Sequence, residues 1–338
     1  MGFKRVVITE HGGPEVLRVV EEARLPEPGP SEVRVRMLAT SAAFTDTMIR
    51  EGKYPGVKET PPFSPGYDMV GEVDALGEGV ASLDVGQRVA ELTVTGSYAE
   101  YLTLPADRLV PVPEGLDPAE AVSLVLSYMT AYQMLHRLAK VGSGQRILYH
   151  GAGGAVGTAM LQLGRLLDLE MYGTASRPKH ELVASLGAVP IDYTREDFVS
   201  RVLKETGDGV DAVFDGIGGS YLRRSFRTLR RGGTLVAFGF YRAWTGRGGS
   251  VPLDFTRLTL WNLLPNGRST AFYSIAPWRQ KHADWFREDL TVLFDLLAEG
   301  GIEPAIAARM PLSEAADAHR WVDRAEVRGK IVLMPDVG

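Results

Sequence analysis

The chain of 338 residues contains no cysteine. This absence excludes disulfide bonds, thiolate metal ligands and a cysteine nucleophile. The sequence also has no uninterrupted apolar run near the roughly 18 residues of a membrane span. The first residues hold no apolar core of signal-peptide length and predict a β-strand instead. Together these absences favour a cytoplasmic protein with no membrane span.

Positive charge is not in excess either. There are 37 lysines and arginines against 42 acidic residues, which gives a formal net charge of -5. A negative chain is a poor general binder of nucleic acid or of anionic membranes. The six histidines are scattered without metal-ligand spacing, so no metal site is predicted. The length is sufficient for two domains with substantial cores.

The pattern of the chain changes near Asp117. Residues 1–122 hold short β-like segments between glycines and prolines, which predicts mostly antiparallel structure with few helices. A helical spacing then begins, with Asp117 as the N-cap and Pro118 at the first helical position. Between residues 147 and 240 apolar β-like segments alternate with helical ones, which indicates a parallel, doubly wound sheet.

The most informative stretch is RILYHGAGGAVG at 146–157, where an apolar strand enters a glycine turn and a helix follows. This layout brings a backbone turn and a helix N-terminus against a pyrophosphate. Gly151 lets the chain leave the strand, Gly154 allows the pyrophosphate to approach, and Gly157 lets the helix pack closely. The spacing is G-x-x-G-x-x-G rather than G-x-G-x-x-G. A tight strand–helix turn without a ligand is the alternative.

The second strand of this unit ends in hydroxyl and basic residues. No Asp or Glu lies between Tyr172 and Lys179. A carboxylate there would repel the 2′-phosphate of NADP, which carries about -1.5 to -2 charges. Ser176 can donate a hydrogen bond, Arg177 offers a planar fork, and Lys179 adds a point charge. These residues predict NADPH (NADP+) as cofactor. The alternative is that Arg177 and Lys179 form a solvated surface.

Further motifs carry a family resemblance that covers nearly the whole chain. Besides HGAGGAVG, they are FTDTMIREGKYP at 44–55, PFSPGYDMVGEV at 62–73 and the triplet LGA at 186–188. Together they resemble the medium-chain dehydrogenase/reductase superfamily, in particular its zinc-free quinone oxidoreductase branch. The segments GYDMVGEV, TASRPKHE and LPNGRSTAFYSI are most similar to the subgroup around the vesicle amine transport protein.

The resemblance implies an α/β protein of two domains. Residues 1–122 and 275–338 would form a GroES-like, mostly-β catalytic domain. Residues 123–274 would form a Rossmann coenzyme domain with a doubly wound parallel sheet. A homodimer is also implied, with TAFYSI at 270–275 as the edge strand that pairs two sheets.

Departures from the family pattern define the expected chemistry. Zinc-dependent members carry Gly-His-Glu at the place of Gly66-Tyr67-Asp68, together with cysteine ligands, so catalytic zinc is not expected here. Hydride transfer then requires an electrophilic acceptor, such as a quinone or an α,β-unsaturated carbonyl (enone or enal). FTDTMIREGKYP resembles the family segment that lines the substrate cleft, here called the cleft segment. Ala43, just before it, and Met48 within it replace the usual Asn and first Tyr. An enoyl-thioester reductase and a non-catalytic NADPH-binding regulatory protein are the alternatives.

Two residues of the cleft segment are the catalytic candidates. An ordinary pKa near 10 keeps Tyr54 protonated at pH 7, and in similar enoyl reductases a tyrosine at this place is the usual candidate proton donor. The alternative is that Tyr54 only packs beside Pro55. Asp46 either orients a cofactor or ligand group or N-caps the helix that begins there.

The resemblance also implies that Thr130 and Lys330 lie near the nicotinamide and Tyr193 near the adenosine phosphate. Thr130 could instead serve helix packing and Lys330 be a surface charge. Phe238 and Phe240 follow the fifth strand, where loops contact ligands, or they belong to the core. The predicted cofactor-binding residues are Thr130, Gly151, Gly154, Ala155, Val156, Gly157, Gly173, Ser176, Arg177, Lys179, Tyr193, Phe238, Phe240 and Lys330.

Some residues are expected to have structural roles only. His150 is interpreted as a strand residue, and His180 and His319 as helix surface. Residues 246–254, rich in glycine, predict a mobile loop.

Overall fold

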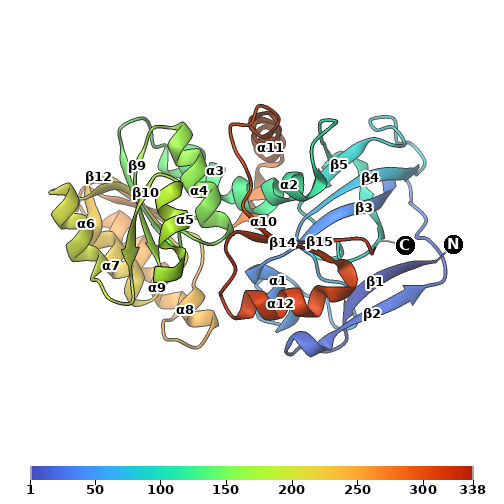
Figure 1. Cartoon of the computed structure of the whole chain (residues 1–338), viewed down its shortest axis with the longest axis horizontal. Helices are drawn as coiled ribbons and strands as arrows, with labels where there is room; N and C mark the ends of the chain where they lie inside the picture. The colour runs from blue at the N-terminus through green and yellow to red at the C-terminus, as the bar shows by residue number, and fades with distance from the viewer. Residues whose placement is uncertain (1, 337–338) are drawn as a thin grey trace. The chain divides into compact units, whose positions relative to one another are not determined.

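The computed structural model describes residues 2–336, which form two compact units (Figure 1). Of the described residues, 2–129 and 284–336 belong to the first unit and 130–283 to the second. Among the described residues no helix is long and apolar enough to cross a membrane.

The first unit is built on a seven-stranded sheet of order β14-β15-β3-β4-β5-β7, with β6 paired to β3, and on a separate antiparallel pair, β1 and β2. Its strands are β1 (Phe3–Ile8), β2 (Leu17–Glu22), β3 (Glu32–Ala42), β4 (Met69–Leu76), β5 (Arg88–Glu91), β6 (Tyr101–Pro105), β7 (Val110–Pro111), β14 (Ile306–Pro311) and β15 (Lys330–Met334). Its helical segments are η1 (Pro14–Val16), α1 (Phe44–Arg50), η2 (Ala106–Arg108), α2 (Pro118–Ser123), η3 (Leu124–Tyr128), α11 (Ala283–Ala298), η6 (Leu312–Glu314) and α12 (Ala315–Asp323).

Strand β3 shows why this sheet forms. Val33, Val35 and Met37 are fully buried, whereas the alternating Arg34 and Arg36 reach solvent and pair with acids on β4. This period of two places one face of the strand in the core. The predicted mostly antiparallel first half of the chain is confirmed by the pairing of β3 with β4 and β6, and of β4 with β5.

The second unit is a six-stranded parallel sheet of order β10-β9-β8-β11-β12-β13, which is the Rossmann order 3-2-1-4-5-6. The strands are β8 (Arg146–His150), β9 (Glu170–Ala175), β10 (Ala188–Asp192), β11 (Val210–Asp215), β12 (Leu229–Ala237) and β13 (Ser269–Phe272). The helical segments are α3 (Met129–Gln133), η4 (Met134–Ala139), α4 (Ala155–Leu166), η5 (Arg177–Lys179), α5 (His180–Ser185), α6 (Phe198–Thr206), α7 (Ser220–Thr228), α8 (Tyr241–Trp244), α9 (Val251–Leu263) and α10 (Ile275–Lys281).

Helices cover both faces of this sheet. Figure 1 shows α4 and α5 on one face and α6 and α7 on the other. The central strand β11 is therefore buried along its whole length. The order of the sheet reverses between β8 and β11, and ligands of open α/β sheets bind beyond the carboxyl ends of the strands at such a point. The fold therefore predicts that the loops that follow β8, β9 and β11 contact a ligand.

Two local predictions have different outcomes. The Asp117 carboxylate accepts hydrogen bonds from the backbone N–H groups of Ala119 and Glu120, both at 3.0 Å, which confirms the N-cap. The predicted loop at 246–254 is wrong at its end, because α9 begins at Val251. Asp254 is fully buried there and holds the neighbouring turn in place, as described below.

Candidate functional site

The glycine loop after β8 is tied to the end of β9. Gly151 adopts a φ of 81°, which side chains rarely allow. Its N–H and that of Ala152 both donate to the Thr174 carbonyl oxygen at 3.0 Å. Gly154 then forms the N-cap of α4 and provides no side-chain cap. The first N–H groups of α4, on Ala155 and after, are the groups that bind an anion at a helix N-terminus.

The glycines of this loop differ in what surrounds them. A Cβ on Gly157 would lie 2.5 Å from the carbonyl oxygens of both Gly151 and Ala152, so only glycine allows the helix to pack there. A Cβ on Gly154 would meet only the Gly151 oxygen, at 3.4 Å, so the space outside Gly154 is open. The close packing at Gly157 and the open space at Gly154 are what a dinucleotide loop requires.

Gly173 lies beneath the loop. A Cβ on this residue of β9 would be 2.6 Å from the Cβ of Ala152 and 3.1 Å from a methyl group of Val183. Gly173 therefore lets the loop and α5 approach the strand, and acts on the loop through packing. Its place among the cofactor-binding residues stays a prediction.

The basic segment lies beside the glycine loop. Ser176 follows the last residue of β9 and is the N-cap of η5, which contains Arg177 and Lys179. The stem of Lys179 lies on the loop, because a Cβ on Gly153 would be 2.8 Å from the Lys179 Cδ. Arg177 is exposed. The loop N–H groups, this lysine and this arginine supply the donors and positive charge that a pyrophosphate and a 2′-phosphate need, so the residues fit NADPH.

The other predicted cofactor residues have mixed surroundings. Tyr193 is half exposed after β10, whereas Thr130 is buried within α3. The ring of Phe238 is partly exposed after β12 and stacks on Tyr149, with centroids 5.8 Å apart. Phe240 is buried and stacks on Phe272 at 5.5 Å, so it belongs to the core.

Sequence reasoning missed two aspartates that shape the turn after β11. Asp215 accepts hydrogen bonds from the N–H groups of Ile217 and Gly218, at 2.8 and 2.9 Å. Asp254 accepts from the N–H of Gly219 at 2.6 Å. Both carboxylates are fully buried. The two carboxylates hold the turn at the point where the strand order of the sheet reverses. The sequence DGIGG at 215–219, at the end of the fourth strand, could have indicated this turn.

His150 is confirmed as a strand residue. Its Nδ1 lies 3.0 Å from the Thr174 hydroxyl and its Nε2 lies 2.9 Å from the Ser225 hydroxyl, which in turn donates to Asp215 at 2.7 Å. Burial lowers the pKa of His150. The imidazole thus connects β9 and α7 within the core of the second unit.

In the first unit, two tyrosines share a hydrogen bond. The hydroxyl groups of Tyr54 and Tyr67 are 2.5 Å apart and their rings meet edge to face. Burial raises the pKa of Tyr54, so its hydroxyl is protonated at neutral pH. Tyr67 is fully buried and was not predicted as a partner. Tyr54 is thus a candidate proton donor. If it gave up its proton, the Tyr67 hydroxyl would stabilise the resulting phenolate by a hydrogen bond.

Asp46 lies at the third position of α1, and its Oδ2 accepts the Ala43 N–H at 3.0 Å. The N-cap is Ala43, so the interpretation of Asp46 as N-cap is wrong. Its Oδ1 is buried with no hydrogen bond among residues 2–336. Burial, with the nearby carboxylate of Asp68, raises the pKa of Asp46 to about 8. Asp46 is therefore mostly protonated at neutral pH.

We expect the stability of Asp46→Asn relative to wild type to rise with pH. Below about pH 4 the carboxyl is protonated in both states. Between about pH 4 and 8 the unfolded chain releases a proton that the folded chain keeps, which costs the wild type up to about 1.4 kcal/mol per pH unit. The substituted asparagine has no such cost and keeps an oxygen for the Ala43 N–H. Urea unfolding at pH 5, 6.5 and 8 measures the difference, with the exposed Asp317→Asn as control. A difference that does not change with pH would contradict the prediction.

Asp68 and Lys330 form a buried ion pair. The Lys330 Nζ lies 2.8 Å from Asp68 Oδ2, the two side chains being 3% and 0% exposed. Asp68 Oδ1 accepts the Ser41 hydroxyl at 2.6 Å. The interpretation of Lys330 as a surface charge is wrong. Its contact with a cofactor stays a prediction.

His319 is also buried, so its interpretation as helix surface is wrong. The Arg50 Nη1 lies 3.1 Å from its Nδ1 and the Tyr98 hydroxyl 3.0 Å from its Nε2. Burial and the guanidinium lower the pKa of His319 to about 3, so the ring is neutral. The described residues contain no group of three or more His, Cys, Asp or Glu side chains able to hold a metal ion.

Comparison with known proteins identifies the family. The alcohol dehydrogenase GroES-like domain matches residues 29–114, and the zinc-binding dehydrogenase family matches residues 186–333. The synaptic vesicle membrane protein VAT-1 homolog of Rattus norvegicus is 32% identical over 98% of this chain and 83% of its own length. The chain belongs to the medium-chain dehydrogenase/reductase superfamily. The predicted two-part fold of a GroES-like domain and a Rossmann sheet is thereby confirmed.

Two further members of the superfamily resemble the chain over nearly its full length. The 2-haloacrylate reductase of a Burkholderia species is 34% identical over 97% of this chain and 98% of its own. The quinone oxidoreductase of Escherichia coli, solved in complex with NADPH, is 28% identical with a TM-score of 0.85, over 98% of this chain and 100% of its own. The first of these relatives is named as a reductase and the second as a quinone oxidoreductase.

Proposed function

We propose that the protein is a zinc-independent, NADPH-dependent reductase of quinones or α,β-unsaturated carbonyls that works in the cytoplasm. The observation that carries the proposal is the glycine loop with Arg177 and Lys179 beside it and no carboxylate at the end of β9. The names of the relatives, a quinone oxidoreductase and a 2-haloacrylate reductase, support the choice of acceptors.

The chain's own residues bind and orient the cofactor. The N–H groups at the start of α4 bind the pyrophosphate, and Arg177 and Lys179 bind the 2′-phosphate. NADPH, when bound, supplies a hydride from C4 of its nicotinamide. The protein contributes position and the exclusion of water to that transfer.

The donor set supports zinc independence. Tyr67 and Asp68 replace the His-Glu pair of zinc-dependent members, and they are engaged with Tyr54 and Lys330. No cysteine is available as a ligand. The acceptor must therefore be electrophilic without metal polarisation. Once reduced it carries negative charge, and the Tyr54 hydroxyl donates the proton while Tyr67 hydrogen-bonds the resulting phenolate.

The Tyr54→Phe change tests the proton donor. We expect kcat to fall by roughly 100-fold, since general acid catalysis contributes about 10²–10⁴, while KM for NADPH stays unchanged. Steady-state kinetics with one enone measures both constants. Tyr67→Phe should have a smaller effect, because it removes only the partner of the donor. A kcat for Tyr54→Phe within about twofold of wild type would remove Tyr54 from the mechanism.

A panel of acceptors tests the function as a whole. NADPH oxidation is followed with 2-alkenals, cyclic enones, quinones and crotonyl thioesters, with NADH as the control cofactor. We expect turnover with quinones or enones. Turnover confined to the thioesters would favour an enoyl-thioester reductase. Tight NADPH binding without any turnover would favour a regulatory protein.

We also propose a homodimer formed through β13. This strand lies at the edge of the second unit's sheet, and the adjacent α9 exposes Leu260 and Leu263, the latter 75% exposed. We expect Leu263→Glu to halve the mass measured by light scattering, from about twice the 36.8 kDa chain to one chain. Leu76→Glu, on the first unit, is the matched control and should stay dimeric. An unchanged mass of the Leu263→Glu variant would refute this interface.

A further inference from the structure

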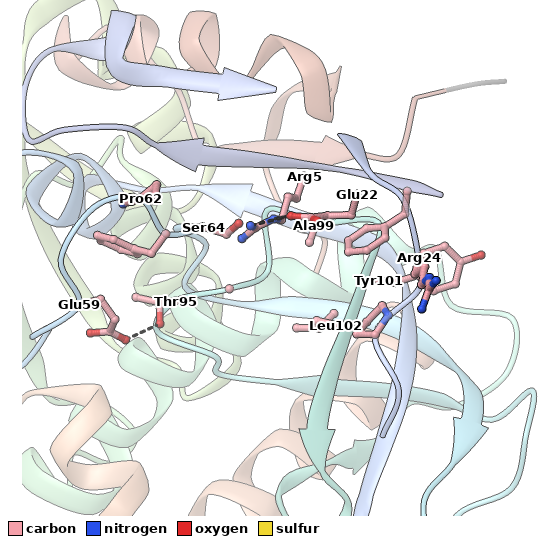
Figure 2. A pocket seen from close by; sticks show the side chains of 14 residues that line it. Arg5, Glu22, Arg24, Glu59, Pro62, Ser64, Thr95, Ala99, Tyr101 and Leu102 are labelled. Atoms are coloured by element: carbon pink, nitrogen blue, oxygen red, sulfur yellow. Dashed lines mark hydrogen bonds and ion pairs between the residues drawn. The ribbon is translucent and has the colours of Figure 1, made fainter. Parts of the chain in front are cut away.

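A pocket lies in the first unit (Figure 2). Its volume is about 560 Å³, within the range of small-molecule sites. It is lined by the β1–β2 pair, by residues 24 and 26 that follow β2, and by segments of residues 59–64 and 95–102. None of its lining residues belongs to the glycine loop, to the basic segment or to the Tyr54–Tyr67 pair.

The walls of the pocket are mainly apolar and aromatic. Phe3 meets Tyr101 edge to face, with ring centroids 6.0 Å apart. Phe63 and the buried Leu102 add further apolar surface. Aromatic walls of this kind favour a ligand with a flat apolar ring.

Most of the charged side chains around the pocket have a partner among residues 2–336, but one arginine does not. Arg5 pairs with Glu22 at 2.7 Å, and Glu59 accepts the Thr95 hydroxyl at 3.0 Å. Arg24 also lines the pocket, and it makes no hydrogen bond or ion pair within residues 2–336. Figure 2 shows Arg24 and Glu59 at opposite ends of the pocket. Arg24 is therefore the cation that remains for the anionic group of a ligand.

Ser64 supplies a second unsatisfied polar group. It lines the pocket between the two ends (Figure 2). Only 8% of the residue is exposed. Its hydroxyl oxygen is itself covered from solvent and has no hydrogen-bond partner in the described part of the chain. Buried hydroxyl groups are normally paired, so a ligand hydroxyl that reaches this covered oxygen would gain a hydrogen bond.

We propose that this pocket binds a small aromatic carboxylate that carries a hydroxyl group. The carboxylate pairs with Arg24, the ring lies against Phe3 and Tyr101, and the hydroxyl bonds with Ser64. The site is independent of the reductase activity, since it uses none of the residues assigned to that function.

Titration calorimetry of the full chain with 6-hydroxy-2-naphthoate tests the site. We expect one molecule bound per chain, about fivefold weaker binding of 2-naphthoate, and no binding of the cationic 2-naphthylmethylammonium. Arg24→Gln should weaken the binding of both naphthoates at least tenfold. Arg18→Gln, at an exposed position of β2 outside the pocket, is the matched control and should bind as wild type does.

The Ser64→Ala variant tests the hydroxyl contact separately. It should bind the two naphthoates with equal affinity, because the hydroxyl no longer has a partner. Unchanged thermal unfolding and NADPH affinity show that the variants are folded. Absence of naphthoate binding to wild type, equal binding of the ammonium compound, or full affinity in Arg24→Gln would each overturn the proposal. None of these results bears on NADPH turnover.

Discussion

Replacing Lys330 by methionine should lower the free energy of unfolding by about 3–5 kcal/mol, the usual cost of leaving a buried charge unpaired. The Asp68 carboxylate is fully buried and loses the ammonium group that lies 2.8 Å away in the wild type. The Ser41 hydroxyl, at 2.6 Å, remains but carries no charge. Urea unfolding at pH 7 measures the loss.

A double variant separates the pair from the individual side chains. When Asp68→Asn accompanies Lys330→Met, no buried charge remains and much of the stability should return, because a neutral replacement of a buried pair is often tolerated. If the free-energy change of the double variant equalled the sum of those of the two single variants, Asp68 and Lys330 would not be coupled. A loss below about 1 kcal/mol in the single variant would mean that Asp68 is not held as a buried anion.

The Arg177→Ala change should weaken NADPH binding by about ten- to a hundredfold and barely affect NADH. A charge-assisted hydrogen bond contributes roughly 1.5–3 kcal/mol, and each 1.4 kcal/mol is a factor of ten. Only NADPH carries the 2′-phosphate that the guanidinium would bind. Fluorescence titration with both cofactors gives the two dissociation constants.

Arg165→Ala is the matched control for this prediction. Arg165 is an exposed arginine in the last turn of α4, at the opposite end of the helix from the glycine loop. The Arg165→Ala change should leave the affinities for NADPH and NADH unchanged. If Arg177→Ala weakened NADPH and NADH equally, the arginine would not distinguish the cofactors, and the assignment of the 2′-phosphate site would be lost.

Local signals made the second unit and the start of α2 predictable. The glycines at 151, 154 and 157, the alternation of strands and helices, and the cap at Asp117 all act within a few residues of the chain. Their conformational demands do not depend on distant partners. The absence of Asp and Glu between Tyr172 and Lys179 is likewise a local feature of the sequence. For these reasons the parallel sheet and the shape of the dinucleotide loop follow from the sequence.

Buried polar pairs were not predictable in the same way. Lys330 and Asp68 are 262 positions apart, and His319 and Arg50 are 269 apart. A single sequence does not indicate which distant groups will meet, so the neighbours of His319 indicated helix surface, and those of Lys330 left a surface charge as one of two alternatives. The interpretation of Asp46 as an N-cap was wrong for a local reason. An Asp at the third helical position and an Asp at the N-cap give nearly the same sequence pattern.

The central claim is best tested by steady-state oxidation of NADPH and NADH by the wild-type protein, with one quinone and one cyclic enone as acceptors. We predict turnover with at least one acceptor and a kcat/KM for NADPH at least tenfold above that for NADH. No turnover with either acceptor, or equal use of the two cofactors, would contradict the account.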